Sequence, residues 1–161
     1  MSANSQKKSR ISPSALPAIG WREWIGLPDF GVLAIKAKID SGAQTSALHA
    51  DSIKIFSRAG RKHVRFILHP LQKRSDIEIE CECELFEMRK VRSSSGHLSV
   101  RPAVILEVEL GGLRWPIEVT LVNRDVMGFR MLLGRQAIRK RFLIDCGRSF
   151  LVGKAPSELG V

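Results

Sequence analysis

Asp40 is the residue of this sequence whose type and setting most clearly predict chemistry. It ends an alternating apolar segment, residues 35–39, and is followed by Ser41, Gly42 and Ala43. The glycine permits a tight turn, and the serine hydroxyl can hydrogen-bond within the loop and hold it rigid. Two carboxylates held about 3 Å apart on such loops share one proton and activate a water molecule. The segment has the residues that half of a carboxylate dyad requires, but the tripeptide alone does not assign that role to Asp40.

The tripeptide Asp-Ser-Gly also marks ordinary turns, so its meaning depends on the surrounding elements. A second apolar segment, residues 131–133, runs into Gly134 and an expected short helix over residues 135–141. Many short strands with one late helix favour an all-β fold, a small closed or half-closed barrel. Alternation and turn residues predict hairpins at 53–69 and 103–122, with further strands at 77–85, 142–145 and 149–152.

Length and composition limit the class of protein. The 161 residues fit one domain, and 44% hydrophobic with 26% charged residues is typical of globular chains. No segment approaches the roughly 18 apolar residues of a membrane helix. Cys81, Cys83 and Cys146 have no disulfide spacing, which predicts free thiols and a cytoplasmic location. We expect a flexible basic tail over residues 1–18, a domain over 19–154 and a C-terminal tail over 155–161.

Several longer segments resemble the retropepsin-like aspartic proteases. These enzymes have an apolar strand, Asp-Thr/Ser-Gly-Ala, a mobile flap, and then an apolar strand that ends in glycine before a short helix. More narrowly, the sequence resembles a bacterial family known both as ATP-dependent zinc proteases and as RimB-like proteins, in residues 20–24, 35–49, 91–97, 123–124 and 127–135. The resemblance covers about residues 19–153. It implies a closed retropepsin-like barrel with one short C-terminal helix and Asp40 as the catalytic aspartate, whose loop is shaped by Ser41, Gly42 and Ala43.

The resemblance also implies how the site is completed. One such motif supplies half of an active site, so two copies of Asp40 are expected to face each other across the axis of a homodimer. A flap is expected between Asp40 and Gly134, because the small residues there suit a closing lid. The flap candidates are Ser93, Ser94, Ser95, Gly96 and His97, and the substrate-binding candidates are His49, Arg92, Leu133, Gly134 and Arg135.

Alternatives within the chain were weighed against this interpretation. Asp145 also follows an apolar strand and precedes Cys146 and Gly147, so it is a rival second carboxylate that would make a monomeric enzyme. Cys146 replaces the hydroxyl residue, however, and the short spacing from Gly134 leaves no room for a second lobe. Neither a phosphate-binding loop nor an H-E-x-x-H zinc motif occurs, so we expect no cofactor and no metal. Cys81 and Cys83 are interpreted as small core residues.

The distribution of positive charge indicates which class of partner the chain binds. The net charge is +10 with a sequence pI of about 10.2, and the excess in the folded part concentrates in residues 87–102 and 124–148. We hypothesise that these residues select an acidic peptide, since arginine binds carboxylates through two hydrogen bonds. The resemblance implies removal of glutamate tails from a small-subunit ribosomal protein, hence proximity to the ribosome and no membrane partner. The alternatives are an inactive ribosome- or RNA-binding module on the same fold, or a zinc-dependent peptidase.

Overall fold

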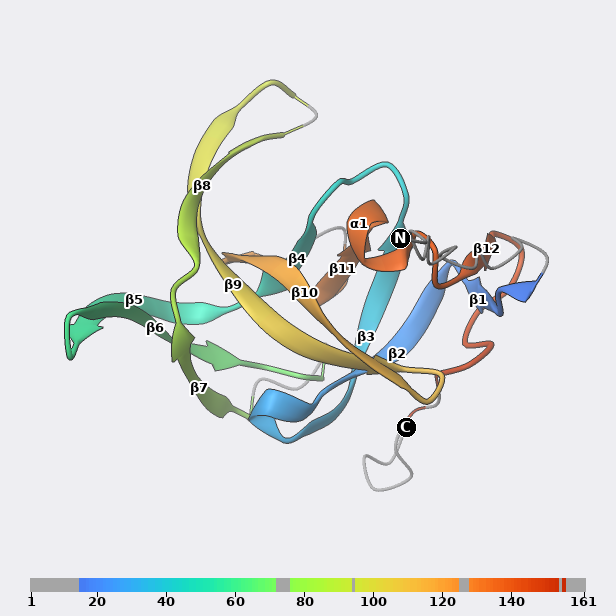
Figure 1. Ribbon diagram of the computed structural model, residues 1–161, viewed down its shortest axis with the longest axis horizontal. Coiled ribbons are helices and arrows are strands. Elements are labelled where there is room, and N and C mark those ends of the chain that lie inside the picture. Colours follow the sequence, from blue (N-terminus) through green and yellow to red (C-terminus); the bar gives the residue numbers. More distant parts are fainter. Residues whose placement is uncertain (1–14, 72–75, 94, 125–127, 154, 156–161) are drawn as a thin grey trace, which may run out of the picture.

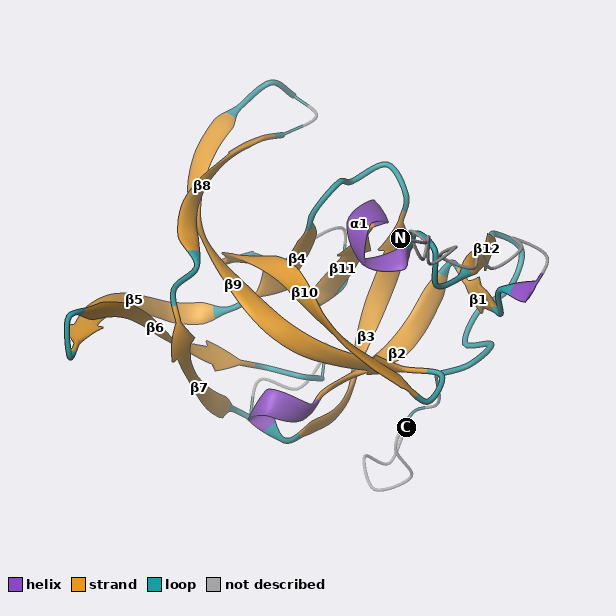
Figure 2. Cartoon of the chain, viewed as in Figure 1, coloured by secondary structure: helices purple, strands orange, loops and turns teal. Residues whose placement is uncertain are grey.

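The structure is a computed structural model that describes residues 15–71, 76–93, 95–124, 128–153 and 155 (Figure 1). These residues form a nearly all-β fold, which confirms the expected fold class (Figure 2). The elements in chain order are β1 (Ala18–Gly20), β2 (Arg22–Leu27), η2 (Pro28–Phe30), β3 (Val32–Asp40), β4 (Ser46–His49), β5 (Asp51–Arg58), β6 (Arg61–Leu68), β7 (Ile79–Glu84), β8 (Glu87–Arg92), β9 (Leu98–Leu110), β10 (Leu113–Val122), β11 (Met131–Gly134), α1 (Arg135–Ile138) and β12 (Leu143–Asp145).

One seven-stranded sheet carries the predicted site. Its strand order is β10-β4-β11-β3-β2-β9-β8, and β10 also pairs with β9, so the hydrogen-bonded order closes on itself. A three-stranded sheet, β5-β6-β7, and a two-stranded sheet, β1-β12, flank it. No helix within the described part of the chain is long and apolar enough to span a membrane.

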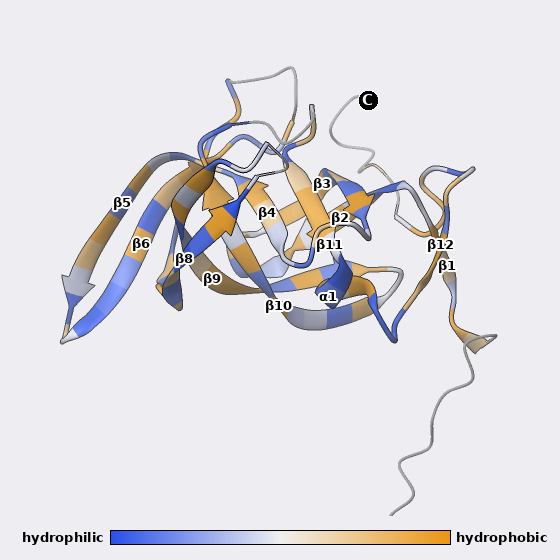
Figure 3. Cartoon of the chain, turned by 90° about the horizontal axis from the view of Figure 1, so that it is seen from above, coloured by the Kyte–Doolittle hydropathy of each residue, from blue (hydrophilic) through white to orange (hydrophobic). Residues whose placement is uncertain are grey.

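The core lies inside the closed strand order. In β3, Ala37 and Ile39 are buried while Lys36 and Lys38 are only partly so, as strand alternation requires. Apolar residues of β2, β4, β9, β10 and β11 join the same cluster. Figure 3 shows hydrophobic residues along the central strands and hydrophilic residues on the outer part of β6. β3, the strand that ends at Asp40, is thus held in place by its own buried residues and by its two neighbours, β2 and β11, which pack in the same core.

Both expected hairpins are present, although β9 begins at Leu98, five residues before the expected hairpin, and other boundaries also differ. Gly60, with φ 77°, turns β5 into β6, and Gly111, with φ 59°, begins the turn between β9 and β10. The helix ends at Ile138 rather than 141, and β1 begins one residue inside the expected N-terminal tail. Residues 149–152 form no strand, because the backbone N–H groups of Leu151 and Val152 point to the buried carboxylate of Glu23. Most of both expected tails lies outside the described residues.

Candidate active site

The loop after β3 holds Asp40 in a tight turn. The backbone N–H of Gly42 donates to Asp40 Oδ1 (2.9 Å), and the N–H of Ala43 donates to the Asp40 carbonyl (3.3 Å). Asp40 pairs with Gly134 across the parallel strands β3 and β11. The carboxylate is therefore oriented by its own loop and lies where two core strands end.

Gly134 is a place where the loop and β11 approach too closely for a side chain. A Cβ there would lie 2.7 Å from the carbonyl carbon of Thr45. The Gly134 N–H donates instead to the buried Ser46 Oγ (3.0 Å). Gly134, which the sequence nominated for substrate binding, thus packs against the end of the aspartate loop.

The N-terminus of helix α1 forms hydrogen bonds to the Asp40 loop. The N–H groups of Arg135 and Gln136 donate to the carbonyls of Ala43 (2.7 Å) and Gln44 (3.1 Å). The Arg135 guanidinium also donates to the Ser41 carbonyl (2.9 Å). Arg135 was a substrate-binding candidate, and in this structure its guanidinium supports the loop.

The flap candidates lie at the tip of the β8–β9 hairpin, which projects from the sheet (Figure 1). The tip is closed by the Ser93 N–H, which donates to the His97 carbonyl (2.8 Å), and by the Gly96 N–H, which donates to the Ser93 carbonyl (2.9 Å). Gly96 has φ 82°, a conformation that side chains disfavour. Ser95, Gly96 and His97 are exposed, and Ser94 lies outside the described residues.

A cavity of about 600 Å³ lies between the flap and the Asp40 loop. We call it the catalytic cleft after the function proposed below; the Asp40 loop forms one of its walls, but Asp40 itself is not among its lining residues. The loop contributes Gly42 and Ala43, β11 contributes Leu132, and the flap strands contribute Arg92 and Arg101. The neighbouring Leu133, which the sequence nominated for substrate binding, is fully buried in the core. Adjacent strand residues face opposite sides, so a one-residue difference decides which leucine lines the cleft.

Arg89, in the wall of the catalytic cleft, is already paired with acids. It forms ion pairs with Glu87 and with Glu118, the latter at 3.0 Å, and these contacts raise the pKa of its guanidinium. Arg92 also lines the cleft and is exposed. The basic excess around the flap is therefore smaller than the sequence balance suggests, because some of it is neutralised within the sheet.

Asp145 occupies a turn of the same form as Asp40. The Gly147 N–H donates to Asp145 Oδ1 (3.0 Å), and the Arg148 N–H donates to the Asp145 carbonyl (3.3 Å). Asp145 pairs with Gly20 across the parallel strands β1 and β12, as Asp40 pairs with Gly134. No residue of the Asp145 turn lines the catalytic cleft, whereas the Asp40 loop contributes Gly42 and Ala43. The Asp145 carboxylate lies 3.6 Å from the Arg148 guanidinium.

Comparison with known proteins places this geometry in a family. The family described as RimB-like, "Retropepsin-like aspartic endopeptidase RimB", matches residues 18–155. The chain belongs to the RimB-like family. The match includes the Asp40 loop, the flap hairpin and β11 with α1, which together form the candidate site.

Curated proteins with another name and one solved structure are also similar to this chain. Proteins named "Probable alpha-L-glutamate ligase" from Shewanella halifaxensis and Desulfotalea psychrophila are 45% identical over 136 residues and 41% identical over 140 residues. These matches cover 84% and 87% of this chain, but the chain spans only about 30% of the length of either relative. A Legionella pneumophila protein of unknown function is 29% identical with a TM-score of 0.67, over 84% of this chain and 97% of that one.

His49 lies in a buried cluster rather than at the catalytic cleft. The Asp51 carboxylate lies 2.8 Å from His69 Nε2 and 3.7 Å from His49 Nε2. In this RimB-like chain both histidines are buried; His49 ends β4 and His69 follows β6. Their contacts with Asp51 therefore connect the start of β5 to the ends of β4 and β6. No group of three or more His, Cys, Asp or Glu residues suited to a metal ion occurs among the residues described.

Two residues that matter to the site were missed from the sequence. Arg101 lines the catalytic cleft, but its place was visible only once β8 and β9 were paired. Glu23 is fully buried in β2 and binds backbone N–H groups of the C-terminal segment. An acidic residue at an inward-facing position of an alternating strand was the available signal for Glu23.

The cysteines of the structure differ in reactivity. Burial raises the pKa of the Cys81 thiol to about 12 and that of the Cys83 thiol to about 11, from 9.0, whereas Cys146 is exposed. Because the thiolate is the reactive form, Cys81 and Cys83 are expected to be inert near neutral pH.

We therefore expect a thiol reagent at pH 8 to modify Cys146 rapidly and the other two only after unfolding, as measured by intact mass. Cys146→Ser is expected to abolish the fast phase. Since folding raises the pKa of Cys81 and Cys83, their contribution to stability is complete below about pH 9 and is lost as pH rises toward 11 to 12. Equal labelling rates for all three thiols in the folded protein would contradict this assignment.

Proposed function

We propose that this chain is an aspartic peptidase whose dyad consists of Asp40 from two copies, and that it acts on acidic, glutamate-tailed proteins such as a modified small-subunit ribosomal protein. The observation that carries the proposal is the Asp40 turn, with its Gly42 hydrogen bond, beneath a flap. Family membership supports the same chemistry. A single loop of this kind with a catalytic cleft on one side calls for a symmetric second copy.

The chemistry follows from two carboxylates that share one proton. The ionised carboxylate takes a proton from a water molecule while the water oxygen attacks the peptide carbonyl carbon. The protonated carboxyl gives its proton to the carbonyl oxygen. The carbon–nitrogen bond then breaks as the nitrogen receives a proton, which yields a new carboxylate and a new amine.

The acidic substrate is supported by the surface and by the relatives. Arg92 and Arg101 line the catalytic cleft, and arginine suits carboxylate recognition. The curated relatives carry the name of a glutamate ligase, and a region similar to this chain makes up about 30% of their length. A peptidase that removes glutamate would undo the reaction of such a ligase by hydrolysing the amide bonds that the ligase forms.

Subunit mixing tests the shared dyad. Wild-type and Asp40→Asn chains, co-expressed in known ratios, are assayed on a glutamate-tailed peptide by mass spectrometry. At equal amounts, random pairing leaves about one quarter of dimers with two Asp40 residues, so the activity per total protein should fall to about a quarter. A fall to only one half, in proportion to the wild-type chain, would contradict a dyad formed between subunits.

A further inference from the structure

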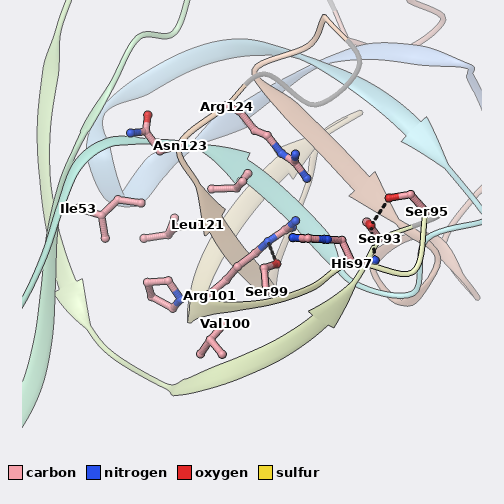
Figure 4. A pocket seen from close by; sticks show the side chains of 12 residues that line it. Ile53, Ser93, Ser95, His97, Ser99, Val100, Arg101, Leu121, Asn123 and Arg124 are labelled. Atoms are coloured by element: carbon pink, nitrogen blue, oxygen red, sulfur yellow. Dashed lines mark hydrogen bonds between the residues drawn. The ribbon is translucent and has the colours of Figure 1, made fainter.

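A second cavity, of about 620 Å³, lies beside the flap (Figure 4). It is bounded by the flap residues Ser93 and His97 and by Arg124, which follows β10. Arg101 lines both this cavity and the catalytic cleft. The two cavities therefore adjoin at this side chain.

Two arginines face this cavity without an acidic partner in the described part of the chain. Arg101 donates from Nε to Ser99 Oγ (3.2 Å) but forms no ion pair there, and neither does Arg124. In Figure 4, Arg101, Arg124 and His97 extend toward the same part of the cavity. Burial and, second, the positive charge of Arg124 lower the pKa of Arg101.

This pair differs from the other arginines of the flap strands. Arg89 is held by Glu87 and Glu118. Bringing two guanidinium groups together while one is partly buried costs free energy unless an anion balances them. The cavity thus has the charge of an anion site. The Ser93 and Ser95 hydroxyls hydrogen-bond to each other, which leaves one of the two O–H groups to donate to a ligand, whereas the Ser99 hydroxyl already donates to the Val91 carbonyl.

We propose that Arg101 and Arg124 form a carboxylate-binding subsite that holds an acidic group of the peptide while its scissile bond lies at Asp40. This inference rests on the proposed peptidase function and adds the residues that select the substrate. A carboxylate fits because each guanidinium presents two parallel donors to its two oxygens. The acidic group is a glutamate side chain or the terminal carboxylate of the tail.

A nucleic-acid phosphate is the less favoured anion. Single-stranded RNA is bound through stacking of bases on exposed rings as well as through charge. Apart from the His97 imidazole, the described residues that line the cavity carry no aromatic ring. The cavity and the catalytic cleft share Arg101 in their walls, so an acidic group bound here lies next to a peptide in the cleft.

The test measures affinity separately from cleavage. Asp40→Asn chains that also carry Arg101→Met or Arg124→Met are titrated with three fluorescent peptides. One ends in several glutamates with a free C-terminus, the second has the same glutamates with a C-terminal amide, and the third has the same number of glutamines with a C-terminal amide and so carries no carboxylate in its tail. Arg114→Met is the matched control, because Arg114 lies on β10 in an exposed ion pair with Glu109, outside both cavities. Thermal unfolding of each variant checks that the fold is retained.

Each cavity variant is expected to raise the Kd for the glutamate peptide about tenfold or more, and to leave the glutamine peptide within about twofold. Arg114→Met should change neither. If the glutamate peptide with a C-terminal amide binds weakly to the chain with both arginines, and the arginine variants do not weaken its binding further, the terminal carboxylate is the bound group. If it behaves like the glutamate peptide with a free C-terminus, a glutamate side chain is the bound group.

Three results would overturn the subsite. They are equal losses for glutamate and glutamine peptides, no binding of the glutamate peptide by the Asp40→Asn chain, and loss confined to a single-stranded RNA oligonucleotide titrated in parallel. Cleavage of the same peptides, followed by mass spectrometry, reports separately on the peptidase function. If the Asp40→Asn chain cleaves like wild type but still discriminates the peptides through Arg101 and Arg124, the aspartic mechanism at Asp40 is wrong and the carboxylate subsite is retained.

Discussion

Asp40→Asn is expected to lower kcat on a glutamate-tailed peptide by about 10³-fold, because an amide neither accepts nor releases the proton that the dyad exchanges with water. The asparagine oxygen can still accept the Gly42 N–H bond, so the loop should persist and KM should change little. The measurement is peptide cleavage followed by mass spectrometry, with and without a chelator. Insensitivity to the chelator together with loss in the variant would support the aspartic mechanism.

Asp145→Asn is the matched control, because Asp145 lies in a turn with the same hydrogen bonds as Asp40. Its kcat should stay within about twofold of wild type. A loss equal to that of Asp40→Asn would indicate an internal dyad and a monomeric enzyme. Full activity of Asp40→Asn would remove the aspartic mechanism, and loss of wild-type activity with the chelator would favour a zinc-dependent peptidase.

The local part of the site was predictable from the sequence. Alternation marked the strand before Asp40, Gly42 marked a tight turn, and Gly134 marked the end of an apolar strand before a short helix, all of which the structure contains. These features depend on residues adjacent in the chain or on the small size of glycine, so composition and spacing carry them.

The cleft walls were less predictable because they depend on pairing between distant strands. Leu132 rather than Leu133 faces the catalytic cleft, a choice fixed by how β11 sits between β3 and β4. Arg135, nominated for substrate, also donates to the Ser41 carbonyl, a contact that the sequence did not indicate. Counting charges along the sequence found the basic segments, but only the contacts distinguish the paired Arg89 from Arg101 and Arg124.

Glu23 shows the same limit for the C-terminal segment. The alternation of residues 149–152 predicted a strand, yet Gly153 passes so close to β2 that a Cβ would lie 2.2 Å from the Trp24 carbonyl oxygen. The segment satisfies its N–H groups with a buried side chain from a residue far away in sequence. The Glu23 carboxylate accepts the N–H bonds that a neighbouring strand would have accepted if residues 149–152 had formed the expected strand.

Glu23→Gln is therefore expected to destabilise the fold strongly. Glu23 Oε1 accepts N–H bonds from Gly20 (2.8 Å) and Leu151 (2.7 Å), and Oε2 accepts one from Gly153 (2.9 Å). In glutamine one oxygen becomes an NH₂ group that faces these donors. Losing charge-assisted bonds and stranding a buried N–H should cost about 3 kcal/mol, which lowers Tm by about 6 to 12 °C for a chain of this size.

The effect should also reach the active site, because Glu23 fixes the chain on both sides of Trp21. The Trp21 N–H donates to the Arg148 carbonyl (2.9 Å), and the Trp21 carbonyl accepts the N–H of Ile39 (2.8 Å), the residue before Asp40. Thermal and urea unfolding measure the loss, with the exposed Glu78→Gln as the control, expected to change stability by about 0.5 kcal/mol or less. Equal stability of the two variants would mean that the Glu23 contacts do not hold the C-terminal segment in solution.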